Sequence, residues 1–203
     1  EILVQSNEWL YDAVWDQANG EFTHNGVQRT YEPQGSARML NAGTAFSNAQ
    51  ELAITDQMMI HEAWSKVDKA LVDVAPNPQQ FRMNKARATI SGMGQYAASA
   101  FIYSNSGTDP EKMLGLAPRM ASLAATANVI GQGGTGSDLT SIYIVQWGLD
   151  SVHMIYSRGG MPSVKHEDKG VQVVYDGSSQ PYDAYMDKFS WTYGLHVINP
   201  KSI

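Results

Sequence analysis

A long helical pattern over residues 78–104 constrains this 203-residue chain more than any other feature. Asn77 is a favourable N-cap, and Pro78 suits the first helical position, where a missing N–H costs nothing. Small or apolar residues recur every three or four positions, at Met83, Ala86, Ile90, Met93, Ala97, Ala100 and Phe101. The other face carries Arg82, Lys85, Arg87 and Gln95. Such a helix is roughly 40 Å long, more than a domain of this size needs. On spacing alone, it also fits a core helix of an ordinary α/β domain.

Composition excludes several classes of protein. With 43% hydrophobic and 17% charged residues, the chain is typical of folded proteins. Its net charge of -6 and scattered basic residues argue against a dedicated nucleic-acid binder. The absence of cysteine excludes disulfides and thiolate metal sites, and the lack of a long apolar run predicts no membrane span. Because the chain opens at Glu1 without a methionine, we expect both termini to continue in the full product.

The residues before the long helix form three blocks. Residues 1–15 predict a short helix. Residues 16–53 are rich in Asn, Gln, Gly, Ser and Thr, and the pieces 21–24, 27–31 and 36–40 alternate weakly like strands. Asn25-Gly26 is a hairpin signal between the first two pieces. Because so polar a hairpin is not stable alone in water, it must lie on its own domain or reach a neighbour. The third block, residues 54–73, is apolar and leads into Pro76 and Pro78.

The last block, residues 110–203, mixes helix and strand patterns. Residues 118–130 predict a helix. Residues 141–148 and 152–156 predict strands joined by a tight turn at 148–150, and 171–175 and 182–197 predict further strands.

Gly131-Gln-Gly-Gly-Thr-Gly136 satisfies the dinucleotide-binding pattern G-x-G-x-x-G. That motif requires a preceding strand and a following helix, so that the pyrophosphate meets a helix N-terminus. Here the predicted order is inverted, with helix before the glycines and strand after them. We therefore predict a flexible loop, and a nucleotide-using α/β enzyme stands as a less favoured alternative.

Catalytic and metal-binding patterns are weak. The five histidines, His24, His61, His153, His166 and His196, lie in separate blocks without ligand spacing, so we predict structural or solvent roles. Ser137 and Asp138 lack the strand–turn–helix context of a nucleophile. We predict a protein that is not an enzyme, with no catalytic residue, cofactor or metal. The pairs Met58/Met59 and Trp9/Trp15 are typical of packing or interface anchors.

Taken in order, several motifs resemble one known family. They begin with the long helix, Phe101-Ile-Tyr-Ser-Asn105 and the Leu114-Gly-Leu-Ala-Pro-Arg119 exit. They continue through residues 128–130, 133–138, 140–148, 152–153, 166–170 and 185–195. Residues 1–7 resemble the family's opening helix, and residues 24–53 match only loosely. The chain thus resembles the major capsid (major structural) proteins of tailed bacteriophages with the Hong Kong 97-like fold.

The resemblance implies an α+β fold divided into named parts. Residues 1–15 would be the N-terminal arm and 16–53 the extended loop. Residues 54–109 would form the peripheral domain, with its spine helix at 78–104, and 110–177 the axial domain. Residues 178–203 would then return to the peripheral domain.

The same resemblance implies self-assembly as the function. Identical subunits would form pentamers and hexamers of an icosahedral shell around a double-stranded DNA genome, without sequence-specific binding and without a membrane. Scaffold, portal or cement proteins are further expected partners, and the virion, assembled in the bacterial cytoplasm, is the expected location. Expected intersubunit contacts are Trp9, Trp15, Arg29, Glu32 and Arg38. An encapsulin-like nanocompartment shell protein is the alternative on the same fold.

Overall fold

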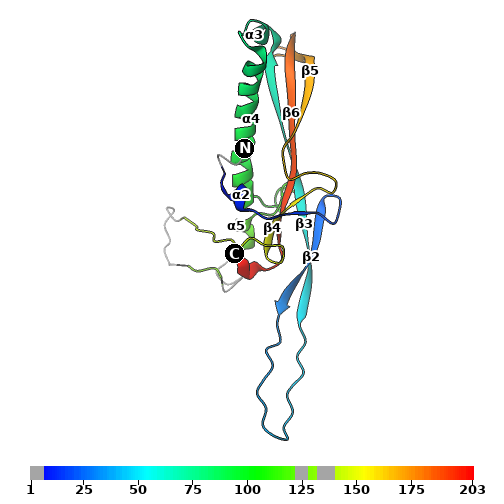
Figure 1. The fold of residues 1–203 in the computed structure, drawn as a ribbon, viewed down its shortest axis with the longest axis vertical. Coiled ribbons are helices and arrows are strands. Elements are labelled where there is room, and N and C mark those ends of the chain that lie inside the picture. The colour runs from blue at the N-terminus through cyan, green and yellow to red at the C-terminus, as the bar shows by residue number, and fades with distance from the viewer. Residues whose placement is uncertain (1–6, 122–127, 132–139) are drawn as a thin grey trace.

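One helix, α4 (Pro78–Tyr103), lies along a long and narrow sheet in the computed structural model, which describes residues 7–121, 128–131 and 140–203 (Figure 1). The shorter helices are α2 (Trp9–Asp12), α3 (Lys69–Asp73), α5 (Leu116–Arg119) and the 3-10 turn η1 (Pro200–Ser202). The strands are β1 (Trp15–Gln17), β2 (Thr23–Tyr31), β3 (Gln50–Asp68), β4 (Val152–Tyr156), β5 (Lys165–Tyr175) and β6 (Pro181–Val197). This architecture confirms the predicted α+β class.

The long strand β6 organises the sheet, whose order is β1-β4-β6-β3-β2 with β5 also paired to β6. Along one edge, β6 pairs antiparallel with β3 from Met58↔Gly194 to Asp68↔Ala184. Along the other edge, it pairs first with β5 and then with β4. Only β1 and β4 run parallel among the named strand pairs of the described residues.

Strand β3 serves two parts of the molecule. Its second half alternates as a half-buried strand should: Met59, Ser65 and Val67 are buried, whereas Ile60 and Trp64 are about half exposed. Its first half leaves β6 and pairs with β2, from Gln50↔Tyr31 to Gln57↔Thr23. One half of β3 thus belongs to the body of the molecule, and the other half belongs to a hairpin that projects away from it (Figure 1).

Helix α4 begins and ends as its sequence predicts. The Asn77 side chain accepts a hydrogen bond from the Gln80 N–H at 3.0 Å, and Pro78 occupies the first turn. At the other end, Ser104 N–H bonds to the Ala100 carbonyl, and Gly115 N–H bonds to the Ser104 carbonyl. A Cβ on Gly115 would lie 2.9 Å from the carbonyl oxygens of residues 100, 101 and 102. The chain can therefore turn back against the helix end only with glycine there.

The core lies where the second half of α4 faces the sheet. Met93, Ala97, Ala100 and Phe101 of the predicted stripe are buried, whereas Met83, near the start of the helix, is half exposed. Arg82 was predicted on the solvent face. Instead its guanidinium bonds to Asp168 at 2.9 Å and to Asp187 at 3.0 Å, which ties α4 to β5 and β6.

One turn prediction and one strand prediction in the polar block are wrong. Asn25-Gly26 is no turn but lies inside β2, paired with Thr55 and Ile54. The Asn25 side chain accepts a hydrogen bond from Thr55 Oγ1 on the neighbouring strand, and the Asn25 backbone bonds to the Asn19 side chain. These bonds hold Asn25 in the sheet and not in a turn. Residues 36–40 form no strand, because no neighbouring strand runs beside this exposed segment.

The predictions for the last block are partly confirmed. Strands β4, β5 and β6 cover the predicted 152–156, 171–175 and 182–197, and the turn after Gly148 is closed by Ser151 N–H to the Gly148 carbonyl. In place of the predicted strand at 141–148, only Trp147 forms a bridge, to Val152. Ile142 and Ile144 are 87% and 81% exposed, so the alternation there has no sheet to face. The predicted helix at 118–130 ends at Arg119, residues 128–130 are not helical, and 122–127 lie outside the described residues.

Among the described residues, no helix combines the length and apolar character that crossing a membrane requires.

Candidate functional site: the projecting hairpin and its base

The hairpin of β2 and the first half of β3 extends beyond the rest of the chain and carries a long exposed tip (Figure 1). Every residue from 31 to 49 is exposed. Three large apolar side chains in this tip, Met39, Leu40 and Phe46, are 81%, 93% and 103% exposed. A two-stranded ribbon of this kind is marginal in water, and exposed apolar groups far from any core mark a contact surface.

The predicted contact residues of the hairpin lie on its outer part. Arg29 and Glu32 form an ion pair at 3.4 Å within the chain, and both side chains are more than half exposed. Arg38 donates a hydrogen bond to the Ala42 carbonyl at 3.1 Å in the tip. All three charged groups are therefore accessible to another molecule.

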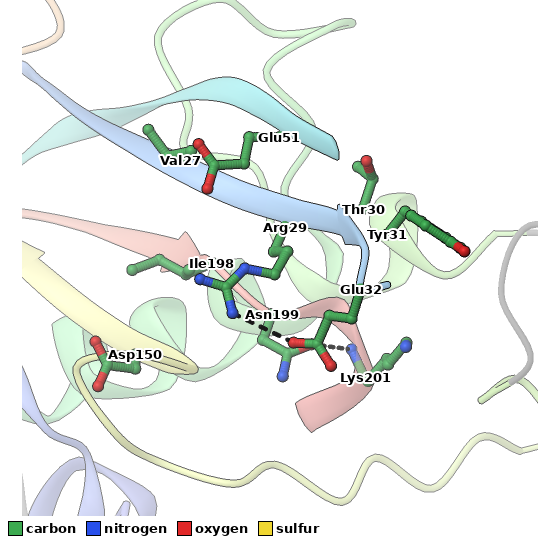
Figure 2. Close-up of a pocket in the computed structure, with 10 residues that line it drawn as sticks. All are labelled: Val27, Arg29, Thr30, Tyr31, Glu32, Glu51, Asp150, Ile198, Asn199 and Lys201. Carbon is green, nitrogen blue, oxygen red and sulfur yellow. Dashed lines mark hydrogen bonds and ion pairs between the residues drawn. The ribbon is translucent and has the colours of Figure 1, made fainter. Parts of the chain in front are cut away.

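A hollow of about 720 Å³ opens between the hairpin and the C-terminal segment. Figure 2 shows Arg29 of β2 and Glu32, just after β2, facing Asn199 and Lys201, with Asp150 at the other end. Val27 and Ile198 add apolar surface to a lining that is otherwise polar and charged with both signs. The hollow therefore presents side chains of both charges between the hairpin and the C-terminal segment.

The predicted anchors Trp9 and Trp15 pack against the chain's own core. Trp9 stacks on Phe101 with ring centroids 4.5 Å apart, and Trp15 lies 6.0 Å from the Trp191 ring. Both side chains are partly buried. Their contact with another subunit stays a prediction.

At the base of the hairpin, Asp56 of β3 is a buried carboxylate with several partners. It bonds to the guanidinium of Arg119 at the end of α5, accepts a hydrogen bond from His196 Nδ1 at 2.8 Å, and accepts another from the Val197 N–H at 3.3 Å. Burial raises the pKa of Asp56, but the bond from His196 and the charge of Arg119 outweigh burial and lower the pKa overall. Asp56 is therefore an anion that fixes the hairpin to the body.

Next to Asp56, three histidines that are distant in sequence come together. His153 and His196 are direct cross-strand partners in β4 and β6, and His24 is the partner of Asp56 across β2 and β3. His24 is 8% exposed, His153 1% and His196 0%. One ring nitrogen from each histidine lies within 4.8 Å of the other two. Sequence reasoning missed this cluster, because only the strand register brings positions 24, 153 and 196 together.

Burial lowers the pKa of His153, and His196 and His24 lower it further, while Asp16 and a backbone group of Gly148 oppose the shift. The pKa of His24 is lowered by burial first and then by His196. Both rings are therefore neutral at neutral pH.

The other two histidines lie apart from the cluster. His61 lies against the rings of Tyr96 and Tyr193, and burial lowers its pKa. His166 stacks on Phe189 and bonds to Asp187 at 2.9 Å. Of the glycine-rich motif, residues 132–136 lie outside the described residues, as do Ser137 and Asp138.

Comparison with known proteins gives consistent matches. The family model described as "Major capsid protein GP7" matches residues 1–203. No curated protein sequence matches the chain. A chain from the near-atomic structure of bacteriophage epsilon15 is 30% identical, with a TM-score of 0.63 over 94% of this chain and 58% of that one. This chain thus spans less than two thirds of the length of its epsilon15 relative.

Two more distant structures share the fold. The capsid of the native GTA particle is 10% identical, with a TM-score of 0.56 over 100% of this chain and 88% of the other. A chain of Mycobacterium phage Adephagia is 11% identical, with a TM-score of 0.54 over 95% and 85% of the two chains.

Proposed function

Because the chain belongs to the family of the major capsid protein GP7, we propose that it is the repeating subunit of an icosahedral shell that encloses a double-stranded DNA phage genome. Its Hong Kong 97-like fold and its family indicate a structural role. In this proposal the protein works by assembly and not by turnover, and it confines DNA without reading its sequence. The virion is its place of action, and the host cytoplasm its place of assembly.

The projecting hairpin carries the proposal. Its tip leaves Met39, Leu40 and Phe46 almost fully exposed, and exposed apolar side chains of this size are unfavourable for a monomer in water. On a neighbouring copy, the same side chains gain apolar contacts, and Arg29 and Arg38 gain acidic partners. Heterologous contacts of this kind, repeated around closed rings of five or six copies, generate a shell from one surface.

The division of the chain follows from this role. We place the N-terminal arm at residues 1–15, the extended loop at 16–53, and the peripheral domain at 54–109 with 178–203. Residues 110–177 form the axial domain near the centre of each ring, although β5 within this range pairs with β6 and is bonded to α4 through Arg82 and Asp168. The ribbon supports this division in one respect, because α4 lies alongside β3 and β6 while the hairpin reaches away from them (Figure 1).

An encapsulin-like compartment is the alternative within the same fold, and the match to a capsid family over the whole chain favours the capsid. The nucleotide-binding enzyme is disfavoured, because described residues 128–131 before the glycine-rich motif form no strand and residues 140–146 after it form no helix. Scaffold, portal and cement proteins are proposed partners on the strength of the family alone.

Assembly of the purified full chain tests the proposal. Negative-stain microscopy and light scattering should show closed shells or ring fragments, and a persistent monomer near 22.2 kDa would contradict it. The triple variant M39S/L40S/F46S should keep its unfolding free energy within about 0.5 kcal/mol, because these side chains are exposed, but should not assemble. V74S/M161S is the matched control, with exposures of 80% and 76% on the body of the molecule.

The contents of particles from phage-producing cells separate the capsid from the compartment. Nuclease-resistant double-stranded DNA inside the particles supports the capsid. Particles that hold cargo protein and no DNA favour the encapsulin-like alternative.

A further inference from the structure

We propose that His24, His153 and His196 form a site for a divalent transition-metal ion, zinc above all, at the base of the projecting hairpin. The three imidazoles come from β2, β4 and β6, so an ion bound by all three joins the hairpin directly to the sheet of the body. The site is independent of shell assembly, since every ligand belongs to one chain.

The first argument is the number of buried nitrogens without a partner. His24 Nδ1, both ring nitrogens of His153, and His196 Nε2 form no hydrogen bond of normal geometry in the described structure. A buried polar atom without a partner destabilises the fold. One ion takes a nitrogen from each ring and so gives a partner to buried nitrogens that otherwise have none. Gly148, whose backbone approaches His153, is placed to support that ring's remaining nitrogen.

The second argument is the orientation of His196. Asp56 accepts a hydrogen bond from its Nδ1, so Nδ1 carries a proton and Nε2 is the nitrogen that remains to bind an ion. A carboxylate bound to the far nitrogen of a ligating imidazole is the usual support of zinc sites, since it fixes the ring and raises its basicity. Arg119 holds Asp56 in turn, so the supporting carboxylate is itself fixed.

The third argument is the close approach of His196 Nε2 to β2. Gly26 faces it from β2, and a Cβ at position 26 would lie 2.3 Å from that nitrogen. His24, two residues earlier on the same strand, points to the same face. Glycine thus allows the His196 ring to lie directly against β2, the strand that carries His24.

The chemistry of the donors selects the ion. Neutral imidazole suits zinc, copper, iron and nickel, and three histidines with one water complete a tetrahedral zinc site. Zinc–nitrogen bonds of about 2.0–2.1 Å place the ligand atoms roughly 3.4 Å apart. Because the three nitrogens already lie within 4.8 Å of one another, small ring rotations bring them to that spacing.

Metal analysis of the full chain tests the proposal. After removal of metal by a chelator, titration with zinc chloride should give one equivalent bound, and cobalt(II) should give the intense visible bands of a tetrahedral site. With zinc at about 100 times its Kd, Tm should rise by roughly 5–10 °C. No bound metal, or cobalt bands typical of an octahedral aquo ion, would overturn the proposal.

Two single variants make the test specific. His24→Gln, at the most accessible member of the cluster, should abolish the cobalt bands and the zinc-induced rise in Tm. His61→Gln, which changes a partly buried histidine outside the cluster, should retain both. Equal binding by the two variants, or equal loss, would place the metal elsewhere and contradict the assignment. If His24→Gln does not fold, the cobalt spectrum of the unmodified chain and of His61→Gln decides the question.

Discussion

Arg119 and Asp56 form an ion pair that joins the end of α5 to β3, although 63 residues separate them in the sequence. Their side chains are only 15% and 7% exposed. The pair lies at the point where β3 leaves the body to become part of the hairpin, so it fixes the direction in which the hairpin projects.

Removing one member of this pair should destabilise the fold strongly. Arg119→Met leaves the buried Asp56 carboxylate without its cationic partner, and we expect a loss of about 3–5 kcal/mol in the free energy of unfolding. Urea denaturation measures the change. The control is Lys69→Met, which breaks an ion pair with Asp73 whose side chains are 40% and 48% exposed, and which should cost at most about 1 kcal/mol. Equal losses in the two variants would show that Asp56 is not held as described.

Two glycine substitutions should act in opposite directions. Gly115→Ala forces a Cβ against three backbone carbonyl oxygens at the end of α4, and we expect a loss of about 1–3 kcal/mol. Gly92→Ala, on the exposed face of the same helix with nothing within 4 Å of the new atom, should stabilise by about 0.5–1 kcal/mol. Thermal unfolding of both variants checks the signs, and a stable G115A protein would show that this helix end is loosely packed.

The exposed arginines of the hairpin should affect assembly without affecting folding. R29A/R38A should change the free energy of unfolding by less than about 0.5 kcal/mol, because both side chains lie on the surface. If each arginine pairs with a neighbouring subunit, the critical concentration for assembly should rise roughly 2- to 5-fold per lost pair. Light scattering across a dilution series measures this concentration. An unchanged value would exclude these arginines from the interface.

The pKa of Glu167 should be lowered to about 2 by the hydrogen bonds and charges of Lys165 and Lys169. A lowered pKa means that the pairing stabilises β5 fully above pH 4.5, the ordinary value, and that this contribution disappears as the pH falls from 4.5 through 2. Carboxyl NMR titration measures the pKa directly. In K165Q/K169Q it should return toward 4.5, and a value near 4.5 in the unmodified chain would contradict the description.

Local chemistry made α4 predictable from the sequence. Asn77, Pro78 and the spacing of apolar residues act within a few turns, and the structure reproduces both helix ends within one residue. The spacing predicted that the apolar stripe of α4 would be buried, but it did not predict how much of the stripe would be. Only the second half of the helix meets the core, which depends on where β3 and β6 run.

Features that depend on strand register were beyond local reasoning. Asn25-Gly26 carries the local signal of a turn, yet Gly26 lies inside β2 because His196 occupies the space that a side chain at position 26 would need. The histidine cluster needs two registers at once, His153 opposite His196 and His24 opposite Asp56. Alternating apolar residues at 142 and 144 likewise predicted a strand whose partner does not exist among the described residues.

The continuity of β3 has a mechanical consequence. A neighbour that grips the hairpin tip pulls along the axis of β3, and from Met58 to Asp68 that strand is held antiparallel against β6. Such a load acts in shear, so all the hydrogen bonds of the ladder bear it at the same time. In a strand that is peeled from its end, the bonds would instead open one after another. A pull at the tip is thereby carried to the opposite end of the molecule, beside α3 (Figure 1). If neighbouring subunits hold the hairpin tip, as proposed, the load on each subunit would pass through the ladder between β3 and β6.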